Sequence, residues 1–191
     1  TLFAAWILVP AVIVLAAASV GRTGHEPRDQ LDKDVELKKK LEEIRLLAGP
    51  LMNLGDVTKK VVPKMCLVAA PATPGGHIAT RSFIPHECHS AIGVFAAVTV
   101  ATAAVLPGSP AHRVARLPEG RIKTLSVEHP TGEFSVRIEV GGSGRTVAGG
   151  NADGGATADR AGTQCVENAD AGLEVDDRAG TPDQDDRRVR R

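Results

Sequence analysis

Apolar residues recur at helical spacing near the beginning of the chain. Residues 32–48 place four of them three or four positions apart, with charged residues between: Leu37, Leu41, Ile44 and Ala48. This spacing predicts an amphipathic helix with one buried face. Asp32 or Asp34 can cap its start, and Gly49-Pro50 is expected to end it.

Two pairs of β-strands are predicted further along. Residues 61–70 are rich in valine, and residues 76–84 are their expected antiparallel partner across a Pro/Gly turn. Residues 123–129 and 133–140 are expected to form a hairpin around Pro130-Thr131-Gly132. Alternation on the last strand marks a core face: Phe134, Val136, Ile138 and Val140.

A run of small apolar residues lies between these two strand pairs. From about residue 87 to residue 105 it carries Ala, Val, Gly and Thr on every side. This composition predicts a helix that is buried all round rather than amphipathic. Leu106-Pro107-Gly108 is expected to stop it. The pattern therefore predicts a mixed α and β protein, but it does not fix how the strands surround the helix.

The two ends of the chain differ from the middle. Residues 2–20 carry no charge and are just long enough to span a bilayer, although Pro10 interrupts the run and no basic residue precedes it. A disrupted strand region of a soluble protein is the favoured alternative to a membrane span. Residues 141–191 are rich in Gly, Ala, Asp and Arg without apolar periodicity, which predicts a disordered tail. We interpret that tail as a shifted reading frame or an unrelated extension, and residues 21–140 as the folded domain.

The composition of the chain limits the classes of function that can be expected. The 191 residues suit one ordinary domain, and 23 basic residues balance 23 acidic ones, so net charge gives no reason to expect nucleic acid. Four Phe, one Trp and no Tyr leave few side chains on which bases could stack. The three cysteines, Cys66, Cys88 and Cys165, show no disulfide spacing, and a reducing cytoplasm is the expected location.

Ionisable side chains gather immediately before the small-residue helix, in the run His86-Glu87-Cys88-His89-Ser90. A helix N-terminus has unpaired N–H groups and partial positive charge, so a carboxylate binds there readily. If these residues form the first turn, a thiol, an imidazole and a hydroxyl share that place, which suits proton transfer on a carboxylic acid. Cys88 could be an acid/base with a lowered pKa or simply a small buried residue.

Other candidates are weaker by pattern alone. Lys64 lies beside the strand that leads toward this run and could pair with a substrate carboxylate, although such lysines are usually only solvated. His77, His86, Cys88 and His89 lack the separated ligand pairs of structural zinc sites, so no metal is expected. No Gly-rich phosphate loop is recognised.

Three separated blocks resemble the PrpF family, which comprises the methylaconitate isomerases and 4-oxalomesaconate tautomerases. They are GDVTKKVVPKMCLVAAP (55–71), GGHIATRSFIPHECHSAIGVFAAVTVATAAVLPG (75–108) and VEHPTGEFSVRIEV (127–140), in the family's order. The resemblance covers roughly residues 21–140 and only the second half of such a protein. It implies an α+β fold, the second domain of a diaminopimelate-epimerase-like fold, with β-strands wrapped around a buried central helix and with the structure possibly incomplete.

The resemblance also implies a function. The family isomerises aconitate-type tricarboxylates without a cofactor, by a 1,3-proton shift or a cis/trans change. Cys88 falls near the place of a catalytic cysteine in diaminopimelate epimerase, and His89 matches a family histidine, so both are the expected catalytic residues. His86, Ser90, Arg81 and Lys64 are the expected substrate-binding residues.

Three hypotheses follow for the chain as a whole. The first is an isomerase that is complete only with a missing N-terminal domain, and the second is an inactive fragment. The third is a binding module anchored in a membrane by residues 2–20. The expected partners are a small di- or tricarboxylate and the missing domain, and a homodimer is also compatible with the resemblance.

Overall fold

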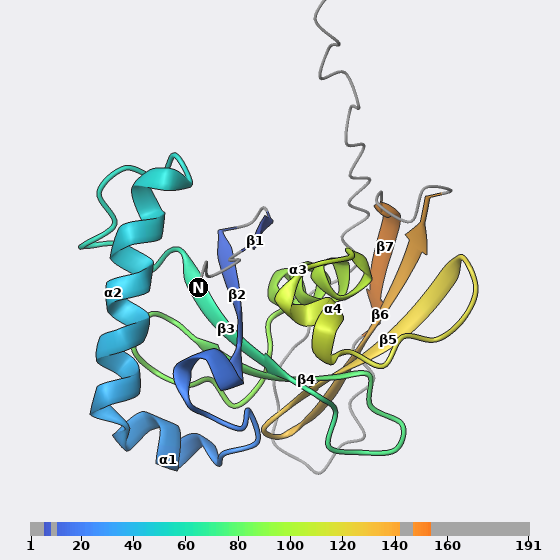
Figure 1. Cartoon of the computed structure of the whole chain (residues 1–191), viewed down its shortest axis with the longest axis horizontal. Coiled ribbons are helices and arrows are strands. Elements are labelled where there is room, and N and C mark those ends of the chain that lie inside the picture. Colours follow the sequence, from blue (N-terminus) through green and yellow to red (C-terminus); the bar gives the residue numbers. More distant parts are fainter. Residues whose placement is uncertain (1–5, 9–10, 142–146, 154–191) are drawn as a thin grey trace, which may run out of the picture.

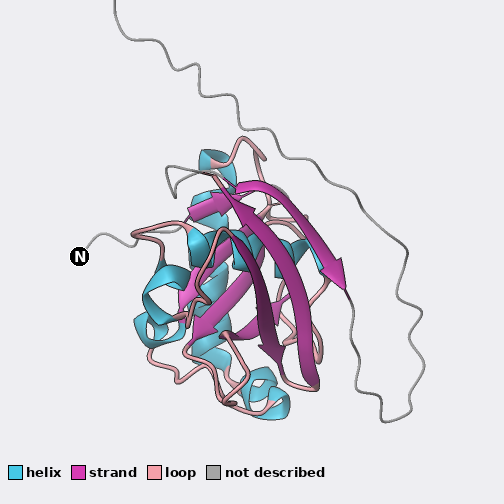
Figure 2. Ribbon diagram, turned by 90° about the vertical axis from the view of Figure 1, so that its right-hand side faces the viewer, coloured by secondary structure: helices cyan, strands magenta, loops and turns pink. Residues whose placement is uncertain are grey.

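The computed structural model describes residues 6–8, 11–141 and 147–153. Their strands form one seven-stranded sheet that follows chain order from β1 to β7 (Figure 1). β2 runs parallel to β3, and β4 runs parallel to β5, whereas the other neighbours are antiparallel. The strands are β1 Trp6–Leu8, β2 Val12–Ala16, β3 Lys64–Ala69, β4 Ile78–Phe83, β5 Ile122–His129, β6 Gly132–Val140 and β7 Val147–Asp153. Figure 2, with strands in magenta, shows how strongly this sheet twists.

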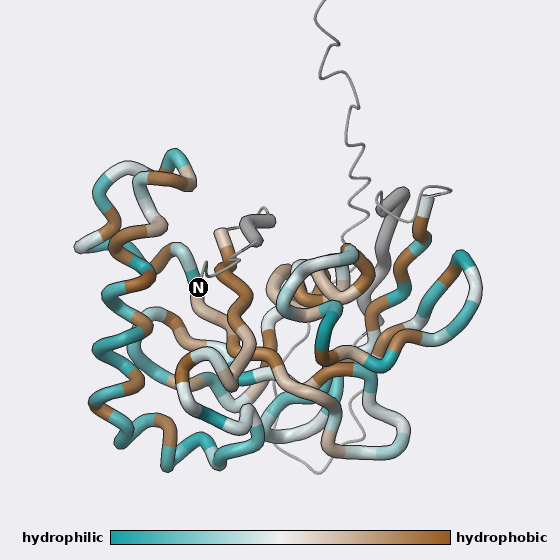
Figure 3. Tube along the Cα trace, viewed as in Figure 1, coloured by the Kyte–Doolittle hydropathy of each residue, from teal (hydrophilic) through white to brown (hydrophobic). Residues whose placement is uncertain are grey.

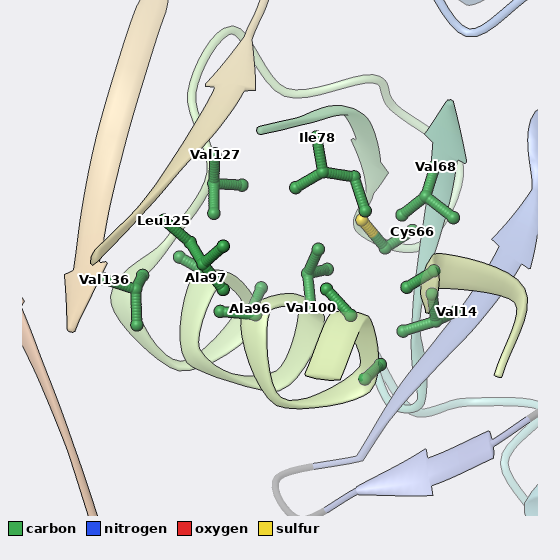
Figure 4. Packing of buried hydrophobic residues seen from close by; sticks show 14 of the residues in the cluster. Val14, Cys66, Val68, Ile78, Ala96, Ala97, Val100, Leu125, Val127 and Val136 are labelled. Atoms are coloured by element: carbon green, nitrogen blue, oxygen red, sulfur yellow. The ribbon is translucent and has the colours of Figure 1, made fainter. Parts of the chain in front are cut away.

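Helices cover the central strands on both faces. The described helices are a short 3₁₀ turn η1 Ala17–Val20, then α1 Arg28–Lys33, α2 Val35–Leu51, α3 Val94–Val105 and α4 Pro110–Val114. On β2 and β3, Val14 and Val68 belong to the core that includes α3, while Ile13 and Leu67 belong to the core beneath α1 and α2. Because both faces are covered, these strands read as continuous apolar runs rather than as alternating ones. Figure 4 shows the first of these cores against α3.

The predicted strand pairs are confirmed. β3 and β4 lie antiparallel with Cys66 opposite Ser82. β5 and β6 form the predicted hairpin, in which Val127 lies opposite Phe134. Along β6 only one face is covered, so the alternation correctly identified Phe134, Val136 and Ile138 as buried, whereas Val140 is only partly buried.

The amphipathic helix is confirmed as α2, and Figure 3 shows teal and brown alternating along it at the left of the view. The Asp34 carboxylate caps its start by accepting a hydrogen bond of 3.0 Å from the Leu37 N–H. The expected end at Gly49-Pro50 is wrong. The Met52 N–H bonds to the Ala48 carbonyl at 2.9 Å, which closes one more turn across the proline.

Two short helices were not anticipated. Asp32 lies in α1, a separate helix, rather than at the start of α2. α4 begins at Pro110, and the Ser109 hydroxyl caps it by accepting a hydrogen bond of 2.9 Å from the His112 N–H. Serine followed by proline at the first helical position was a sequence signal for this helix.

The helix predicted from about residue 87 begins later, at Val94 with Gly93 as its cap. Cys88 instead forms an antiparallel bridge with Phe83, and the Ile84 N–H bonds to the Glu87 carbonyl at 3.1 Å. Backbone groups used in this way cannot join a helical turn. The predicted stop after residue 105 is confirmed, and most of α3 is buried, but Phe95 in its first turn is 60% exposed.

The ends of the chain also depart from expectation. Residues 6–8 and 12–16 are strands, and no helix within the described residues is long and apolar enough to cross a membrane. The disordered tail predicted from residue 141 is wrong over Val147–Asp153, which pairs with β6 as a strand. The remainder of that prediction, over residues 142–146 and 154–191, lies outside the described residues.

Candidate functional site

A pocket of about 220 Å³ lies where β3 and β4 meet the start of α3. Its lining is mostly apolar, with a few polar groups: Val12, Lys64, Met65, Cys66, Ser82, Ile84, His89, Ala91, Ile92, Gly93 and Ala96. Lys64 and His89, two of the expected site residues, thus line one pocket although they lie 25 residues apart in the chain, and their expected roles stay predictions. Ser82 and Gly93 were missed, because neither residue type is distinctive without knowledge of the fold.

The start of α3 supplies hydrogen-bond donors to this pocket. The first backbone bond of the helix runs from the Ala97 N–H to the Gly93 carbonyl at 2.9 Å, so the preceding N–H groups have no partner within the helix. No side chain among the described residues caps them. Gly93 and Ala96 both line the pocket, which puts these donors and the positive end of the helix dipole at its wall.

His89 and Lys64 are each held by a backbone hydrogen bond. The His89 N–H donates to the Ser82 carbonyl at 2.8 Å, which ties the loop before α3 to β4. The Lys64 N–H donates to the Ala11 carbonyl at 2.8 Å, at the beginning of β3. An imidazole, an ammonium group and free helix N–H groups can together bind a carboxylate and move a proton near it.

Cys88 lies apart from the pocket. Its side chain is fully buried in the core beneath α1 and α2, on the other side of the sheet from α3. Burial, followed by the nearby Asp32 carboxylate, raises the pKa of the Cys88 thiol to about 11. Of the two alternatives for Cys88, the structure supports the small buried residue, because Cys88 precedes α3 and packs away from it. A catalytic role for Cys88 stays a prediction that the geometry does not favour.

Arg81 also points away from the pocket. Its guanidinium is buried and donates to the carbonyls of Glu26 and Thr80, each at 2.8 Å. Burial lowers the pKa of Arg81. These contacts tie β4 to the segment before α1, so the expected contact with substrate finds no support in the position of this side chain.

His86 and Ser90 lie on the loop but do not line the pocket. The His86 Nδ1 atom is 3.7 Å from the Glu42 carboxylate on α2, and the ring is largely exposed. The Ser90 carbonyl accepts a hydrogen bond of 2.9 Å from the Thr131 hydroxyl at the turn between β5 and β6. Their predicted roles in substrate binding stay predictions. The described residues contain no cluster of three or more His, Cys, Asp or Glu side chains that could hold a metal ion.

The arrangement of sheet and central helix has a counterpart among solved structures. A crystal structure of methylitaconate-delta-isomerase superimposes with a TM-score of 0.64 at 23% sequence identity, covering 71% of this chain and 39% of that one. At this identity the likeness establishes the fold, an α+β fold of the diaminopimelate-epimerase-like class.

The family follows from the sequence match. Residues 5–151 match the model of the PrpF protein, and the chain belongs to the PrpF family. It is 60% identical over 136 residues to the (4E)-oxalomesaconate Delta-isomerase of a Novosphingobium species, covering 71% of this chain and 38% of that protein. It is 54% identical over 129 residues to the 4-oxalomesaconate tautomerase of Pseudomonas putida, covering 68% of this chain and 36% of that protein. The chain thus spans less than two fifths of the length of these relatives.

Proposed function

We propose that this chain forms one wall of the active site of a cofactor-independent isomerase or tautomerase that acts on an oxalomesaconate-like tricarboxylate. One observation carries the proposal. The pocket joins His89, Lys64 and the free N–H groups of α3, in a chain 60% identical over 136 residues to a protein named as an oxalomesaconate isomerase.

In this proposal the pocket binds a substrate carboxylate. The N–H groups at the start of α3 donate to the carboxylate, and the Lys64 ammonium adds a full positive charge. When a proton leaves the carbon next to the carboxylate, negative charge spreads onto its oxygen atoms. Donors that are already in place stabilise that charge in the transition state.

His89 supplies an imidazole to the pocket, a group that can both accept and donate a proton. A 1,3-proton shift removes a proton from one carbon and returns one two carbons away, and it leaves the substrate with the same atoms. We assign one of these transfers to His89. The second acid/base would come from the part of the relatives' length that this chain does not span.

The chain spans only 38% of the length of the Novosphingobium relative, and an exposed aromatic residue, Phe95, lies beside this pocket. It lies in the first turn of α3 and is 60% exposed, beside the pocket residues Gly93 and Ala96. The chain alone is therefore expected to bind the carboxylate weakly and to turn it over slowly or not at all.

The binding step can be tested on the 191-residue chain with tricarballylate, a stable tricarboxylate. In ¹H–¹⁵N spectra we expect shifts for His89, Gly93 and Val94. Lys64→Ala and His89→Ala should each weaken binding about tenfold, the loss of one charge-assisted hydrogen bond. Lys59→Ala is the matched control, since Lys59 is exposed and does not line the pocket. Unchanged binding in both pocket variants would overturn the proposal.

Activity can be tested by exchange into a complete relative. Residues 11–141 of this chain would replace the matching segment of the Novosphingobium isomerase, and conversion of oxalomesaconate would be followed by ultraviolet absorbance. We expect activity in the exchanged protein and a large loss on adding His89→Ala. A folded but inactive exchange protein would count against the proposal.

A further inference from the structure

The two peptide groups that flank Cys88 are each held at both polar ends. In the first, the Cys88 N–H donates to the Asp32 carboxylate at 2.6 Å and the Glu87 carbonyl accepts from the Ile84 N–H at 3.1 Å. In the second, the Cys88 carbonyl accepts from Arg28 Nε at 2.7 Å and the His89 N–H donates to the Ser82 carbonyl at 2.8 Å. A peptide group is planar, so fixing both of its ends fixes its orientation.

The two side chains that reach Cys88 also hold each other. Arg28 and Asp32 are four residues apart on α1, and Arg28 Nε lies 3.4 Å from the Asp32 carboxylate. One carboxylate oxygen takes the Cys88 N–H while the other faces the guanidinium. We call this pair of side chains the α1 clamp. Both of its bonds to Cys88 involve a charged group, which makes them stronger than neutral hydrogen bonds.

The clamp acts at the residue just before His89. The second peptide group contains the His89 nitrogen, so its orientation determines where the His89 Cα and side chain leave the loop. Ser82, which receives the His89 N–H, lines the same pocket as His89. The clamp thus connects α1, on one side of the sheet, with a pocket that opens beside α3 on the other.

We propose that Asp32 and Arg28 are positioning residues for His89, holding the Cys88 backbone so that the imidazole faces the pocket. This proposal rests on the proposed function in one respect, namely that His89 serves a carboxylate ligand there. In this arrangement Cys88 contributes through its backbone, and its thiol has no part in the chemistry. Asp32 and Arg28 lie outside the pocket lining and act only through the loop.

The clamp itself can be tested without a ligand, because the chain carries an internal pair of reporters. Cys88 and Cys66 are both fully buried, but in different cores. Labelling of the native 191-residue chain with N-ethylmaleimide, with each cysteine quantified by mass spectrometry, measures local opening at each one. In Asp32→Ala, Cys88 should label at least about tenfold faster, as expected when a hydrogen bond to a charged group is lost, while Cys66 keeps its rate.

Two further variants make this result specific. Asp29→Ala is the matched control, since Asp29 is an exposed aspartate of the same helix, and it should leave both rates unchanged. Arg28→Ala should resemble Asp32→Ala. Equal acceleration at Cys66 and Cys88 would show only global destabilisation, and no acceleration would show that the clamp does not hold the loop. Either result overturns the proposal.

The effect on His89 is measured with the tricarballylate titration. Asp32→Ala should weaken binding about tenfold and abolish the shift of the His89 imidazole signals, while the α3 amide signals still respond. Asp32→Ala binding as tightly as the wild type, with Cys88 exposed, would overturn the positioning role alone. A wild-type chain that does not bind tricarballylate would overturn the proposed function, whatever the labelling result.

Discussion

Cys66 and Cys88 are both fully buried, in cores that lie on opposite faces of the sheet. Cys66 faces α3 and the Ser82 hydroxyl, 3.6 Å from its sulfur, whereas Cys88 packs beneath α1 and α2. Burial raises the pKa of Cys66 to about 12, and burial together with the Asp32 carboxylate raises that of Cys88 to about 11. Both thiols are therefore protonated near neutral pH, so neither can act as a base there.

These two pKa values predict a loss of stability in alkali. The usual thiol pKa is 9.0, and both folded values lie above it. Below pH 9 the thiols are protonated in both the folded and the unfolded chain, so their contribution to the free energy of unfolding is complete. That free energy falls as pH rises from 9 toward 11, because only the unfolded chain can release the protons. The loss should be about 1.4 kcal/mol for each thiol and each pH unit in that window. Urea unfolding from pH 8 to pH 11 measures it.

A cysteine variant provides the comparison for this experiment. In a Cys165→Ala background, Cys88→Ala should be less stable at pH 8 because of the cavity it creates, yet its stability should fall less steeply up to pH 11. Parallel pH profiles for the two proteins would contradict the raised pKa of Cys88.

Arg45 offers a test of a buried charge. Its guanidinium is 1% exposed and donates to the carbonyls of Val57, Lys60 and Val62, each at 3.0 Å, while also pairing with Glu42 at 2.7 Å. Arg45→Met keeps the apolar stem but leaves those carbonyls unsatisfied. We expect a loss of about 3–5 kcal/mol in the free energy of unfolding, measured with urea. Arg113→Ala, at an exposed arginine, should change it by less than about 0.5 kcal/mol.

The strands could be predicted from the sequence because their pattern is local. β6 has one covered face, so Phe134, Val136 and Ile138 could be recognised as buried from the alternation of apolar and polar residues. β3 and β4 are covered on both faces. An apolar run was enough to find β3, and β4 was found as its partner across the Pro/Gly turn. The helix start was misplaced because the backbone of residues 88–89 bonds to α1, which lies 56 residues away, and folds back onto β4.

The candidate site could be predicted only in part, because contacts between residues that are distant in the chain leave no local pattern in the sequence. Lys64 and His89 were chosen by residue type and by proximity to a strand and a helix, and both line the pocket. Arg81 and Cys88 were assigned to the same place, but both lie toward the opposite face from α3. One residue of shift along a strand reverses the face of a side chain, and sequence alone did not fix that register. No spacing rule points from Asp32 to Cys88, 56 residues away.

The carboxylate of Glu128 is expected to make the free energy of unfolding fall in acid. Its buried carboxylate accepts hydrogen bonds from the Ala72 N–H at 2.7 Å and from the N–H and hydroxyl of Thr73 at 2.8 and 2.5 Å. Burial acts to raise the pKa of Glu128, but these hydrogen bonds outweigh it and the pKa is lowered. Its stabilisation is thus complete above the unfolded pKa and is lost as pH falls through the folded value. Glu128→Gln should flatten the acid limb of urea unfolding between pH 5 and pH 3, and an unchanged limb would contradict this.

Gly76 is expected to tolerate no side chain because of that same carboxylate. A Cβ at Gly76 would lie 1.9 Å from Oε1 of Glu128, whereas a Cβ at the neighbouring Gly75 would meet nothing within 4 Å. A carboxylate at the end of a free side chain could move aside. Here it is held by Ala72 and Thr73, so moving it breaks those hydrogen bonds. Gly76→Ala should therefore lower the free energy of unfolding by about 2–3 kcal/mol, the cost of leaving such groups unsatisfied.

The neighbouring glycine and a double variant make this prediction specific. Gly75→Ala should change the free energy of unfolding by no more than about 1 kcal/mol, because its Cβ meets nothing within 4 Å. It is a matched control, since the two substitutions have similar effects on the unfolded chain. If the clash acts through the Glu128 carboxylate, Gly76→Ala should cost much less in a Glu128→Ala background, where the two nearest obstructing atoms are absent and the Thr73 hydroxyl remains at 2.9 Å. Urea unfolding of the four proteins at pH 7 gives this coupling energy. Additive losses would show that Gly76 is required for some reason other than its contact with Glu128.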